Sequence, residues 1–479
     1  MNPMPAIVPI AILGAGSTVV YLVARVAPRR TSLLAALTAS IMAAALGALL
    51  SSGPPNRVPS IVSPGEALFL EPGGCLIAST ALVLGTIVAL YSARYLALDR
   101  HPDRYFPLLL LMLAGTVGAT LASDLFTLYL FVVLTNGASY VLVAFRRETE
   151  TAIEAGFKYA ITGTMGSMFL LAGIALVFRD TGSLSLPMPA AAPGTGHQLG
   201  LGLITFGLLV KAAVFPAHTW LPDAHGRAPS SISALLSGII VPLHIYLLVK
   251  LAMALHAPQP ALGWLLTALG AGSLIAGNVL ALRQSYGKRL LGYSTIAQVG
   301  YMCLAFGLGM ALGQPEPIAA GFLLLVGHAL LKGLAFLAKG SLHLYYGATT
   351  LNDLTDLGRR APLASGLLSA ALLGLAGMPP LPGFAGKFAL LWAIAGLDSR
   401  AAYAVAALFL LGSLVSLGYY LPLIGRLLHR APQTAPGHRH SRWIHLPMVG
   451  LAALTLLLGV WPWPVWRMAL EAARFLGGW

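Results

Sequence analysis

The chain alternates between long apolar runs and short polar or Pro/Gly-rich segments. A run of about 17 to 25 apolar residues is long enough to cross the hydrocarbon core of a bilayer as an α-helix. Fourteen such runs are predicted, at residues 4–24, 32–52, 73–93, 105–122, 124–145, 153–178, 200–221, 229–250, 260–282, 290–312, 318–345, 362–397, 401–425 and 443–463. The pattern therefore predicts an all-α polytopic membrane protein with about 14 transmembrane helices.

The seventh run is interrupted near its middle. It carries Lys211 and then Pro216 and Pro222, within the sequence KAAVFPAHTWLPDAH (211–225). Proline has no backbone N–H and cannot continue a regular helix, so carbonyl groups are left without partners inside the membrane. Transporters build mid-membrane ion sites from discontinuous helices around ionisable groups. We therefore predict a discontinuous seventh helix with an ion site at Lys211; the alternative is a proline kink with a lysine that extends to the interface.

The twelfth run is interrupted in a similar way. The sequence LLGLAGMPPLPGFAGKFALLW (372–392) contains Pro379, Pro380 and Pro382, followed by Lys387. Two lysine-bearing interruptions five runs apart suggest two inverted five-helix repeats, formed by helices 4–8 and 9–13. The chain then divides into an N-terminal three-helix segment (1–104), a first repeat (105–250), a second repeat (260–425) and a last helix with a C-terminal tail (426–479).

Composition supports the membrane assignment and limits the chemistry. Apolar residues make up 57% and charged residues 9% of the 479 residues, and the mean hydropathy is +0.81. The net charge of +14 reflects few acids, 15 against 29 basic residues, so nucleic acid is not an expected partner. Two distant cysteines, Cys75 and Cys303, form no metal-binding or disulfide pattern, and no phosphate loop, carboxylate pair or nucleophile constellation is present. We expect no metal, no cofactor and no catalytic chemistry within this chain.

The basic residues are distributed unevenly between the loops. Loops after odd-numbered runs hold 18 Lys and Arg residues, whereas loops after even-numbered runs and the C-terminal tail hold six, among them Lys250. Positive charge concentrates in cytoplasmic loops. The bias predicts a multi-pass protein with both termini on the non-cytoplasmic side.

The five remaining basic residues lie within the runs and are all lysines: Lys158, Lys211, Lys332, Lys339 and Lys387. A charge at the centre of a transmembrane helix costs roughly 2.5–3.5 kcal/mol on insertion scales. Arginine keeps its charge in proteins, whereas a lysine removed from water can lose its proton near neutral pH. These lysines are therefore the residues that could change protonation during transport, except that Lys339, near the end of its run, is expected to extend to the interface.

Three shorter spacings add local detail. His328 and Lys332 are four residues apart and share a helical face, which suits a proton relay or an ordinary packed histidine. Glu154 and Lys158 have the i,i+4 spacing of an interfacial salt bridge. Asp124 is placed to cap the start of the fifth helix.

Several blocks of sequence carry a family resemblance. The strongest are KAAVFPAHTWLPDAHGRAPSSISALLSG (211–238), KRLLGYSTIAQVGYM (288–302), HALLKGLAFLAKGSL (328–342), and NDLTDLG with GMPPLPGFAGK (352–358 and 377–387). Over roughly residues 105–425 the chain resembles the proton-conducting, antiporter-like membrane subunits shared by respiratory complex I, Mrp-type sodium/proton antiporters and membrane-bound energy-converting hydrogenases.

The resemblance implies a location, partners and site residues. It implies the prokaryotic inner membrane, other membrane subunits of a complex I-like, Mrp-like or hydrogenase-like assembly, and transport of protons or sodium. By position it assigns relay roles to Lys211, Lys332, Lys387, His218 and His328. The candidate accessory residues are His225, Asp223, His244, Lys158 and Asn136.

The chain departs from the family pattern at three positions. Val133 stands where the family usually has a glutamate that pairs with the seventh-helix lysine, and Pro242 stands where an eighth-helix lysine is usual. Tyr286 replaces a favoured aspartate. Asn136, near the helical face of Val133, could hold water but carries no charge. A counter-charge for Lys211 must then come from a neighbouring subunit, or is no longer needed.

Three functional hypotheses follow. The first is a proton- or sodium-translocating membrane subunit of a redox-driven or antiporter complex, a translocase component without catalytic chemistry of its own. The second, suggested by Val133 and Pro242, is a structural or adapter subunit that has lost its own pumping. The third is a module that energises uptake of another solute, such as inorganic carbon.

Overall fold

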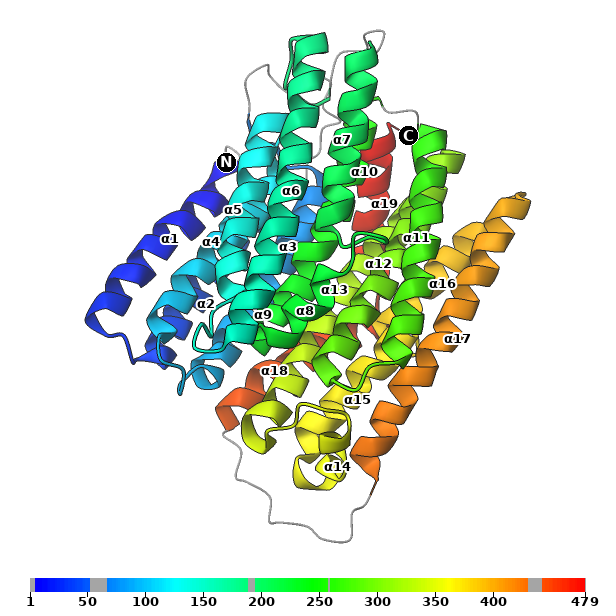
Figure 1. Cartoon of the computed structure of the whole chain (residues 1–479). Coiled ribbons are helices and arrows are strands. Elements are labelled where there is room, and N and C mark those ends of the chain that lie inside the picture. The colour runs from blue at the N-terminus through cyan, green and yellow to red at the C-terminus, as the bar shows by residue number, and fades with distance from the viewer. Residues whose placement is uncertain (1–4, 52–66, 188–193, 257–258, 430–441, 479) are drawn as a thin grey trace.

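The protein is an elongated bundle of helices (Figure 1). The computed structural model describes residues 5–51, 67–187, 194–256, 259–429 and 442–478. Its first helices are α1 (Ile7–Val26), α2 (Thr31–Ser51), α3 (Pro72–Tyr95), α4 (Pro102–Leu121), α5 (Leu125–Val143), α6 (Glu150–Thr181), α7 (Thr195–Lys211), α8 (Trp220–Arg227), α9 (Ser230–Leu235), the π-helix η1 (Leu236–Ile240) and α10 (Val241–Ala254). They are followed by α11 (Gln259–Leu282), α12 (Gly287–Leu312), α13 (Pro315–Tyr346), the 3-10 helix η2 (Asn352–Leu354), α14 (Leu357–Arg360), α15 (Pro362–Ala376), α16 (Pro382–Ala395), α17 (Arg400–Leu428), α18 (Arg442–Val460) and α19 (Trp463–Gly477).

The all-α polytopic prediction is confirmed. Twelve helical stretches of the described residues are long and apolar enough to cross a membrane. The stretch α9–η1–α10 counts as one of them, and the broken pairs α7–α8 and α15–α16 supply the seventh and twelfth crossings. Together these make the fourteen crossings that the apolar runs predict. Asp124 caps α5 as expected, because its carboxylate accepts from the backbone N–H groups of Phe126 and Thr127.

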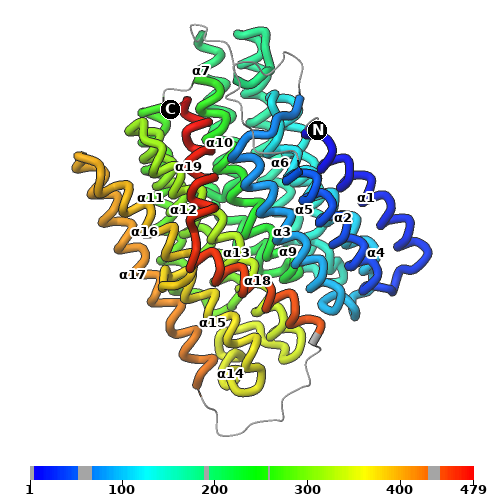
Figure 2. Tube along the Cα trace, turned by 180° about the vertical axis from the view of Figure 1, so that it is seen from behind, coloured from blue at the N-terminus to red at the C-terminus, as the bar shows by residue number. Residues whose placement is uncertain are grey.

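The C-terminal part differs from the prediction of one helix followed by a tail. α18 ends at Val460, and after Trp461 and Pro462 the chain forms a further helix, α19. Figure 2 shows α19 continuing from α18 toward the end of the bundle where the N-terminus also lies. α19 packs against α3 and α13 and buries Ala469, Ala472 and Ala473.

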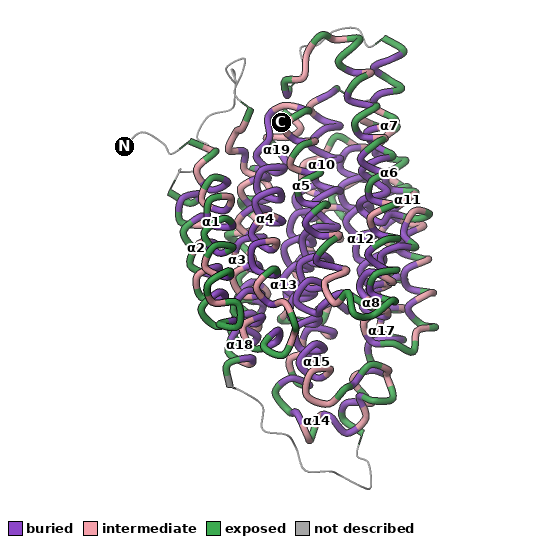
Figure 3. Tube along the Cα trace, turned by 60° about the vertical axis from the view of Figure 1, so that its left-hand side comes forward, coloured by how far each residue is buried: buried purple, intermediate pink, exposed green. Residues whose placement is uncertain are grey.

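The helix at the centre of the bundle is α13. The most apolar stretch of α13 is entirely buried, as is that of α9–η1–α10, whereas most of the corresponding stretches of α1 and α17 are not buried. Figure 3 shows this contrast between buried inner helices and outer helices with exposed sides. Polar groups within the most apolar stretches of α10, α12 and α13 are therefore held away from both lipid and bulk water.

Two helix pairs approach closely through glycines spaced seven residues apart. α6 and α7 meet where Gly173 faces Gly200 and where Gly166 faces Gly207; a Cβ on Gly200 would lie 2.7 Å from the Gly173 carbonyl oxygen. α11 and α12 meet in the same way along glycines 263 and 270 of one helix and 307 and 300 of the other. Small residues at such contacts let helix backbones pack directly in a membrane. These contacts fix the helices that carry the site described below.

One residue assigned to a loop lies inside the bundle. Lys250 is buried in α10, and its Nζ lies 3.2 Å from the Glu71 carboxylate at the start of α3. The same amine donates to the carbonyl oxygens of Thr120 and Ala122 at 3.0 and 2.8 Å, and Tyr246 donates to Glu71. The prediction for Lys250 was wrong because the residue lies at the end of its apolar run, where sequence alone does not separate a buried position from a loop. Three arginines counted among the loop residues in the charge comparison, Arg57, Arg430 and Arg439, lie outside the described residues.

Candidate functional site

The break in the seventh crossing is an eight-residue segment with its own hydrogen bonds. α7 ends at Lys211 and α8 begins at Trp220. The indole Nε1 of Trp220 donates to the Val210 carbonyl at 3.2 Å, and the backbone N–H of Phe215 donates to Ser273 Oγ on α11 at 2.9 Å. These bonds satisfy backbone groups that the lost helix leaves without partners. Pro216 lies in this segment, whereas Pro222, predicted to contribute to the break, is in the first turn of α8, where proline is tolerated.

Lys211 turns from the end of α7 onto α6. Its Nζ donates to the carbonyl oxygen of Gly163 at 2.9 Å and to the Oγ of Ser167 at 2.7 Å. Gly166 makes room for the side chain, because a Cβ there would lie 3.1 Å from the lysine Cγ. The amine is thus held by neutral groups in the interior.

Lys332 lies in the fully buried part of α13 and donates to α12. Its Nζ bonds the Leu291 carbonyl oxygen at 2.7 Å and also the Oγ of Ser294. The pattern of Lys211 is repeated, with one backbone carbonyl and one serine hydroxyl as acceptors.

Lys387 lies on α16, after the break in the twelfth crossing. Its Nζ donates to the carbonyl of Ala376, the last residue of α15, and to Ser413 Oγ on α17, both at 2.9 Å. The amine also lies 4.6 Å from the centre of the Tyr301 ring. Gly377, with φ +99°, leaves space for the lysine side chain, since a Cβ there would lie 2.9 Å from the Lys387 Cδ. The broken helix therefore supplies the carbonyl that the lysine uses.

The amines of the three lysines have the same kind of hydrogen-bond acceptors. Each amine has a carbonyl and a serine hydroxyl as acceptors, and none forms an ion pair with a carboxylate among the described residues. A serine hydroxyl can accept from an ammonium group or donate to a neutral amine. The arrangement is therefore compatible with either protonation state of each lysine.

A polar stripe on α12 joins the second and third of these lysines. Ser294 bonds Lys332, Gln298 donates to the Leu375 carbonyl near the end of α15 at 3.0 Å, and Tyr301 lies beside Lys387 and 3.3 Å from Ser413. The spacing of 294, 298 and 301 places these side chains on one helical face over roughly 10 Å. The stripe was not predicted, although its spacing is visible within the block 288–302.

His328 contacts the π-helix. Its Nε2 lies 3.0 Å from the carbonyl oxygen of Ser237 in η1, and the Ser237 hydroxyl is 2.7 Å from Thr295 Oγ1 on α12. A π-helical turn frees carbonyl groups from the regular helical pattern. Through Ser237 the structure connects His328 to Thr295 of α12, and His328 lies one turn of α13 from Lys332, as the spacing predicts.

The other three predicted histidines have no direct contact with the buried lysines through hydrogen bonds of the described residues. His225 is fully buried, stacks on Phe336 with ring centres 4.8 Å apart, and has neither ring nitrogen hydrogen-bonded within the described part of the chain. His218 lies in the broken segment beside Phe215, and His244 is buried in α10. No hydrogen bond among the described residues joins any of these three rings to a relay lysine.

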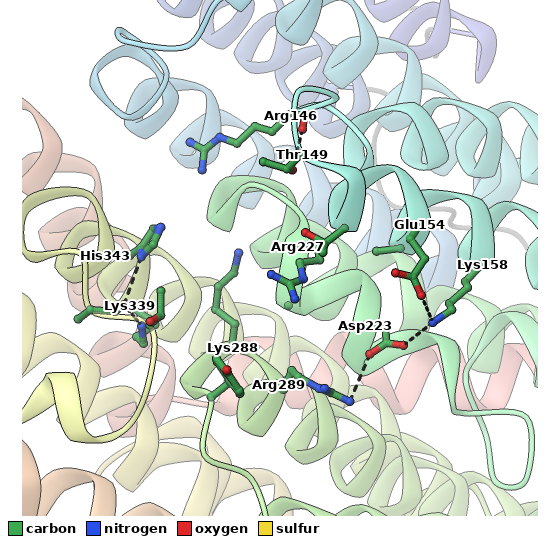
Figure 4. A pocket seen from close by; sticks show the side chains of 16 residues that line it. Arg146, Thr149, Glu154, Lys158, Asp223, Arg227, Lys288, Arg289, Lys339 and His343 are labelled. Carbon is green, nitrogen blue, oxygen red and sulfur yellow. Dashed lines mark hydrogen bonds and ion pairs between the residues drawn. The ribbon is translucent and has the colours of Figure 1, made fainter.

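Two candidate accessory residues, Lys158 and Asp223, lie apart from the buried lysines. The Nζ of Lys158 is 2.6 Å from the Glu154 carboxylate, which confirms the predicted pair, and 3.5 Å from that of Asp223. Asp223 also bonds Arg289 at 3.2 Å. Figure 4 shows this group on one side of a cavity of about 660 Å³. Loops after the fifth, seventh, ninth and eleventh crossings meet here, as the charge pattern predicts for one face of the membrane.

Lys339 and His343 line the same cavity. Lys339 donates to the carbonyl oxygen of Ala348, just beyond the end of α13, at 2.6 Å. Its amine therefore extends toward the helix end as expected, but the side chain is buried instead of solvated.

The position that lacks the expected acid lies on the outside of the bundle. Val133 is 39% exposed on α5. Asn136 is buried and donates to the Val132 carbonyl of its own helix at 2.8 Å. Neither residue contacts Lys211 through a hydrogen bond of the described structure. A charge provided for this region by another protein would have to approach the outer face of α5.

Comparison with known proteins agrees with this architecture. A family model described as NADH:quinone oxidoreductase/Mrp antiporter, TM, matches residues 122–416. NADH-quinone oxidoreductase subunit N of Geobacter metallireducens is 32% identical over 488 residues, covering 98% of each chain. F(420)H(2) dehydrogenase subunit N of Methanosarcina mazei is 30% identical over 423 residues, covering 82% of each.

A solved structure matches over nearly the whole length. A chain of the membrane-bound sulfane sulfur reductase, an archaeal respiratory membrane complex, superposes with a TM-score of 0.87 at 29% identity, covering 98% of this chain and 97% of that one. The family model spans more than half of the chain, including α7, α13 and α16 with their lysines. The chain belongs to the NADH:quinone oxidoreductase/Mrp antiporter family of membrane proteins.

Proposed function

We propose that this chain is a cation-translocating membrane subunit of a multisubunit respiratory or antiporter complex. Protons, or sodium, would move along the middle of the membrane past Lys211, Lys332 and Lys387, with His218 and His328 as further relay groups. The observation that carries the proposal is the shared coordination of the three buried amines by neutral carbonyl and serine groups.

The proposed mechanism follows from this coordination. An amine with a fixed carboxylate partner is stabilised in its charged form, which opposes proton release. A serine hydroxyl that can reverse its hydrogen bond permits the amine to change protonation without breaking its contact. The α12 stripe then provides polar groups between Lys332 and Lys387, where a proton would otherwise cross apolar side chains.

The partners are inferred from relatives. The similar proteins carry names of dehydrogenase subunits and of a respiratory membrane complex. We infer that this chain works with further membrane subunits, and that redox chemistry, where the complex has it, resides in them. A neighbouring subunit against the exposed face of α5 at Val133 could supply the charge that this chain lacks. We infer a prokaryotic inner membrane from the relatives. We infer from the loop charges that both termini lie on the non-cytoplasmic side.

Substitution of the lysines in the native complex tests the proposal. Lys211→Met and Lys332→Met should abolish or strongly reduce coupled proton or sodium movement in sealed vesicles. Lys211→Arg should fail to restore it, because arginine keeps its proton. Arg25→Gln, which removes an exposed charge at the end of α1, serves as the control and should transport normally.

A second candidate function is an adapter subunit without transport of its own. Val133 favours it, because the acid that usually accompanies the seventh-helix lysine is missing. Unchanged coupled transport in an assembled complex that carries Lys211→Met would contradict translocation through this chain and support the adapter. Parallel assays without sodium and with a protonophore separate the two cations.

A further inference from the structure

The cavity at the loop face contains more positive than negative charge. Two carboxylates line it, Glu154 and Asp223, and both are engaged by Lys158, with Arg289 also on Asp223. The cationic side chains that line it are Arg146, Lys158, Arg227, Lys288, Arg289 and Lys339. Arg146 is paired with Asp99, a carboxylate that does not line the cavity, at 3.0 Å. The other five cations against two carboxylates leave an excess of three positive charges in a partly enclosed space.

Three of these cations have no carboxylate partner among the residues that the structure describes. Arg227, Lys288 and Lys339 form no ion pair within the described structure, although the Lys288 amine donates to the Ala228 carbonyl and the Lys339 amine to that of Ala348. In Figure 4 the ends of the Arg227 and Lys288 side chains point into the same space. Like charges that converge near a membrane surface repel one another and gain from a bound anion.

Other donors face the same cavity. The Nε of Arg289 is buried and has no hydrogen-bond partner among the described residues. Two long helices also begin at its edge: α12 follows Tyr286, and α6 follows Thr149, and neither preceding side chain caps its helix. The first backbone N–H of α12, that of Gly287, donates to the Thr349 carbonyl oxygen at 3.1 Å. The other N–H groups in the first turn of a helix have no acceptor within that helix, and the positive end of the helix dipole favours an anion.

We propose that this cavity binds a phosphate group, carried by an anionic phospholipid headgroup or by a soluble phosphate. A phosphate offers several acceptor oxygens at once and matches the fork of an arginine side chain better than a single carboxylate does. Basic pockets between transmembrane helices at a membrane face are suited to anionic headgroups. The proposal concerns an anion site at the loop face and does not depend on transport through the buried lysines.

Binding to the purified complex tests the proposal. The complex is placed in phosphatidylcholine nanodiscs. One arm adds phosphatidylglycerol and counts the lipid retained by native mass spectrometry. A second arm measures binding of radiolabelled inorganic phosphate and pyrophosphate. Whichever phosphate-bearing probe binds, Arg227→Gln and Lys288→Gln should each weaken its binding about fivefold. One cation near a membrane surface contributes that much to binding an anion.

Matched variants separate charge from folding. Lys288→Arg and Arg227→Lys keep the charge and should retain binding. Arg25→Gln and Arg426→Gln remove the same charge outside the residues that line the cavity and should bind as the unsubstituted complex does.

The outcomes identify the anion or reject the site. Charge-dependent retention of phosphatidylglycerol alone assigns a lipid, and charge-dependent binding of phosphate or pyrophosphate alone assigns a soluble anion. Equal binding by all variants overturns the proposal. It is also overturned if Arg227→Gln releases a partner subunit without affecting either probe, because an acidic side chain of that partner would then be the counter-charge.

Discussion

The Nζ of Lys211 donates a hydrogen bond of 2.7 Å to the Oγ of Ser167, one helix away on α6. The same relation joins Lys332 to Ser294 and Lys387 to Ser413. Three serines from three different helices thus complete the surroundings of three buried amines. The recurrence indicates that the hydroxyl is part of the site and not an incidental neighbour.

Removing this hydroxyl should slow transport without removing the lysine. In Ser167→Ala the amine keeps the Gly163 carbonyl as its one acceptor among the described residues. A hydrogen bond to a charged group contributes roughly 1.5–3 kcal/mol, so we expect coupled transport to fall by about tenfold or more while the complex still assembles. Thr86→Ala is a suitable control, because that hydroxyl bonds Leu82 within its own helix. Equal transport by both variants would remove Ser167 from the site.

Sequence predicted the crossings and breaks because both follow from one physical constraint. A segment must be long and apolar to cross lipid, so Lys211 and Pro216 are conspicuous within such a run. Serine and glutamine do not interrupt an apolar run in the same way. The sequence alone therefore does not identify Ser294 and Gln298 as site residues; their role follows from the contacts that α12 makes in the structure.

The ends of the runs were the least predictable part. Lys250 lies where a run gives way to polar residues, and its partner Glu71 is far away in sequence, so only the fold brings the two together. α19 was missed for a related reason. It is a short amphipathic helix that contains Arg467, Glu471 and Arg474. The prediction looked for continuous apolar runs, and an amphipathic helix does not form one.

The close contact of α6 and α7 can be tested with two glycines of one helix. In Gly200→Ala the new Cβ would lie 2.7 Å from the Gly173 carbonyl oxygen and 2.8 Å from Val177 Cγ2, so the helices must separate. We expect a loss of stability of roughly 1–3 kcal/mol, seen as a lower Tm of the purified protein. Gly202→Ala meets no atom within 4 Å and should keep or raise the Tm by the helix propensity of alanine. A similar Tm for the two variants would contradict direct backbone packing at Gly200.

The loop after α13 should have a measurable pH dependence. The carboxylate of Asp353 accepts from the backbone N–H groups of Thr350 and Thr349 at 2.7 and 2.9 Å, and these bonds lower the pKa of Asp353 to about 2. Because the folded-state pKa is depressed, the stabilisation is complete above the ordinary pKa of about 3.9 and is lost as pH falls through about 2.

Asp353→Asn measures this contribution locally. At pH 7 the amides of Thr349 and Thr350 should exchange hydrogen faster in the variant than in the original protein. The ratio of the two rates should approach one as the pH is lowered from about 4 toward 2, because the aspartate then loses its charge. A ratio that stays constant over this range would show that the carboxylate does not hold the turn.

For the buried pair of Glu71 and Lys250, we expect a double substitution to lower the thermal stability less than either single substitution does. Both side chains are almost fully buried, with 7% and 6% of their surface exposed. Removing one partner leaves an uncompensated charge in the interior, which costs roughly 3–5 kcal/mol, so Lys250→Met and Glu71→Gln should each lower the Tm sharply. The double variant buries no charge at this site and should recover most of the loss, since replacing a whole buried pair with neutral groups is often close to neutral. Thermal unfolding of the four proteins in one detergent gives the coupling energy directly. Additive losses would mean that the 3.2 Å contact contributes little, and that the carbonyls of Thr120 and Ala122 alone hold the Lys250 amine.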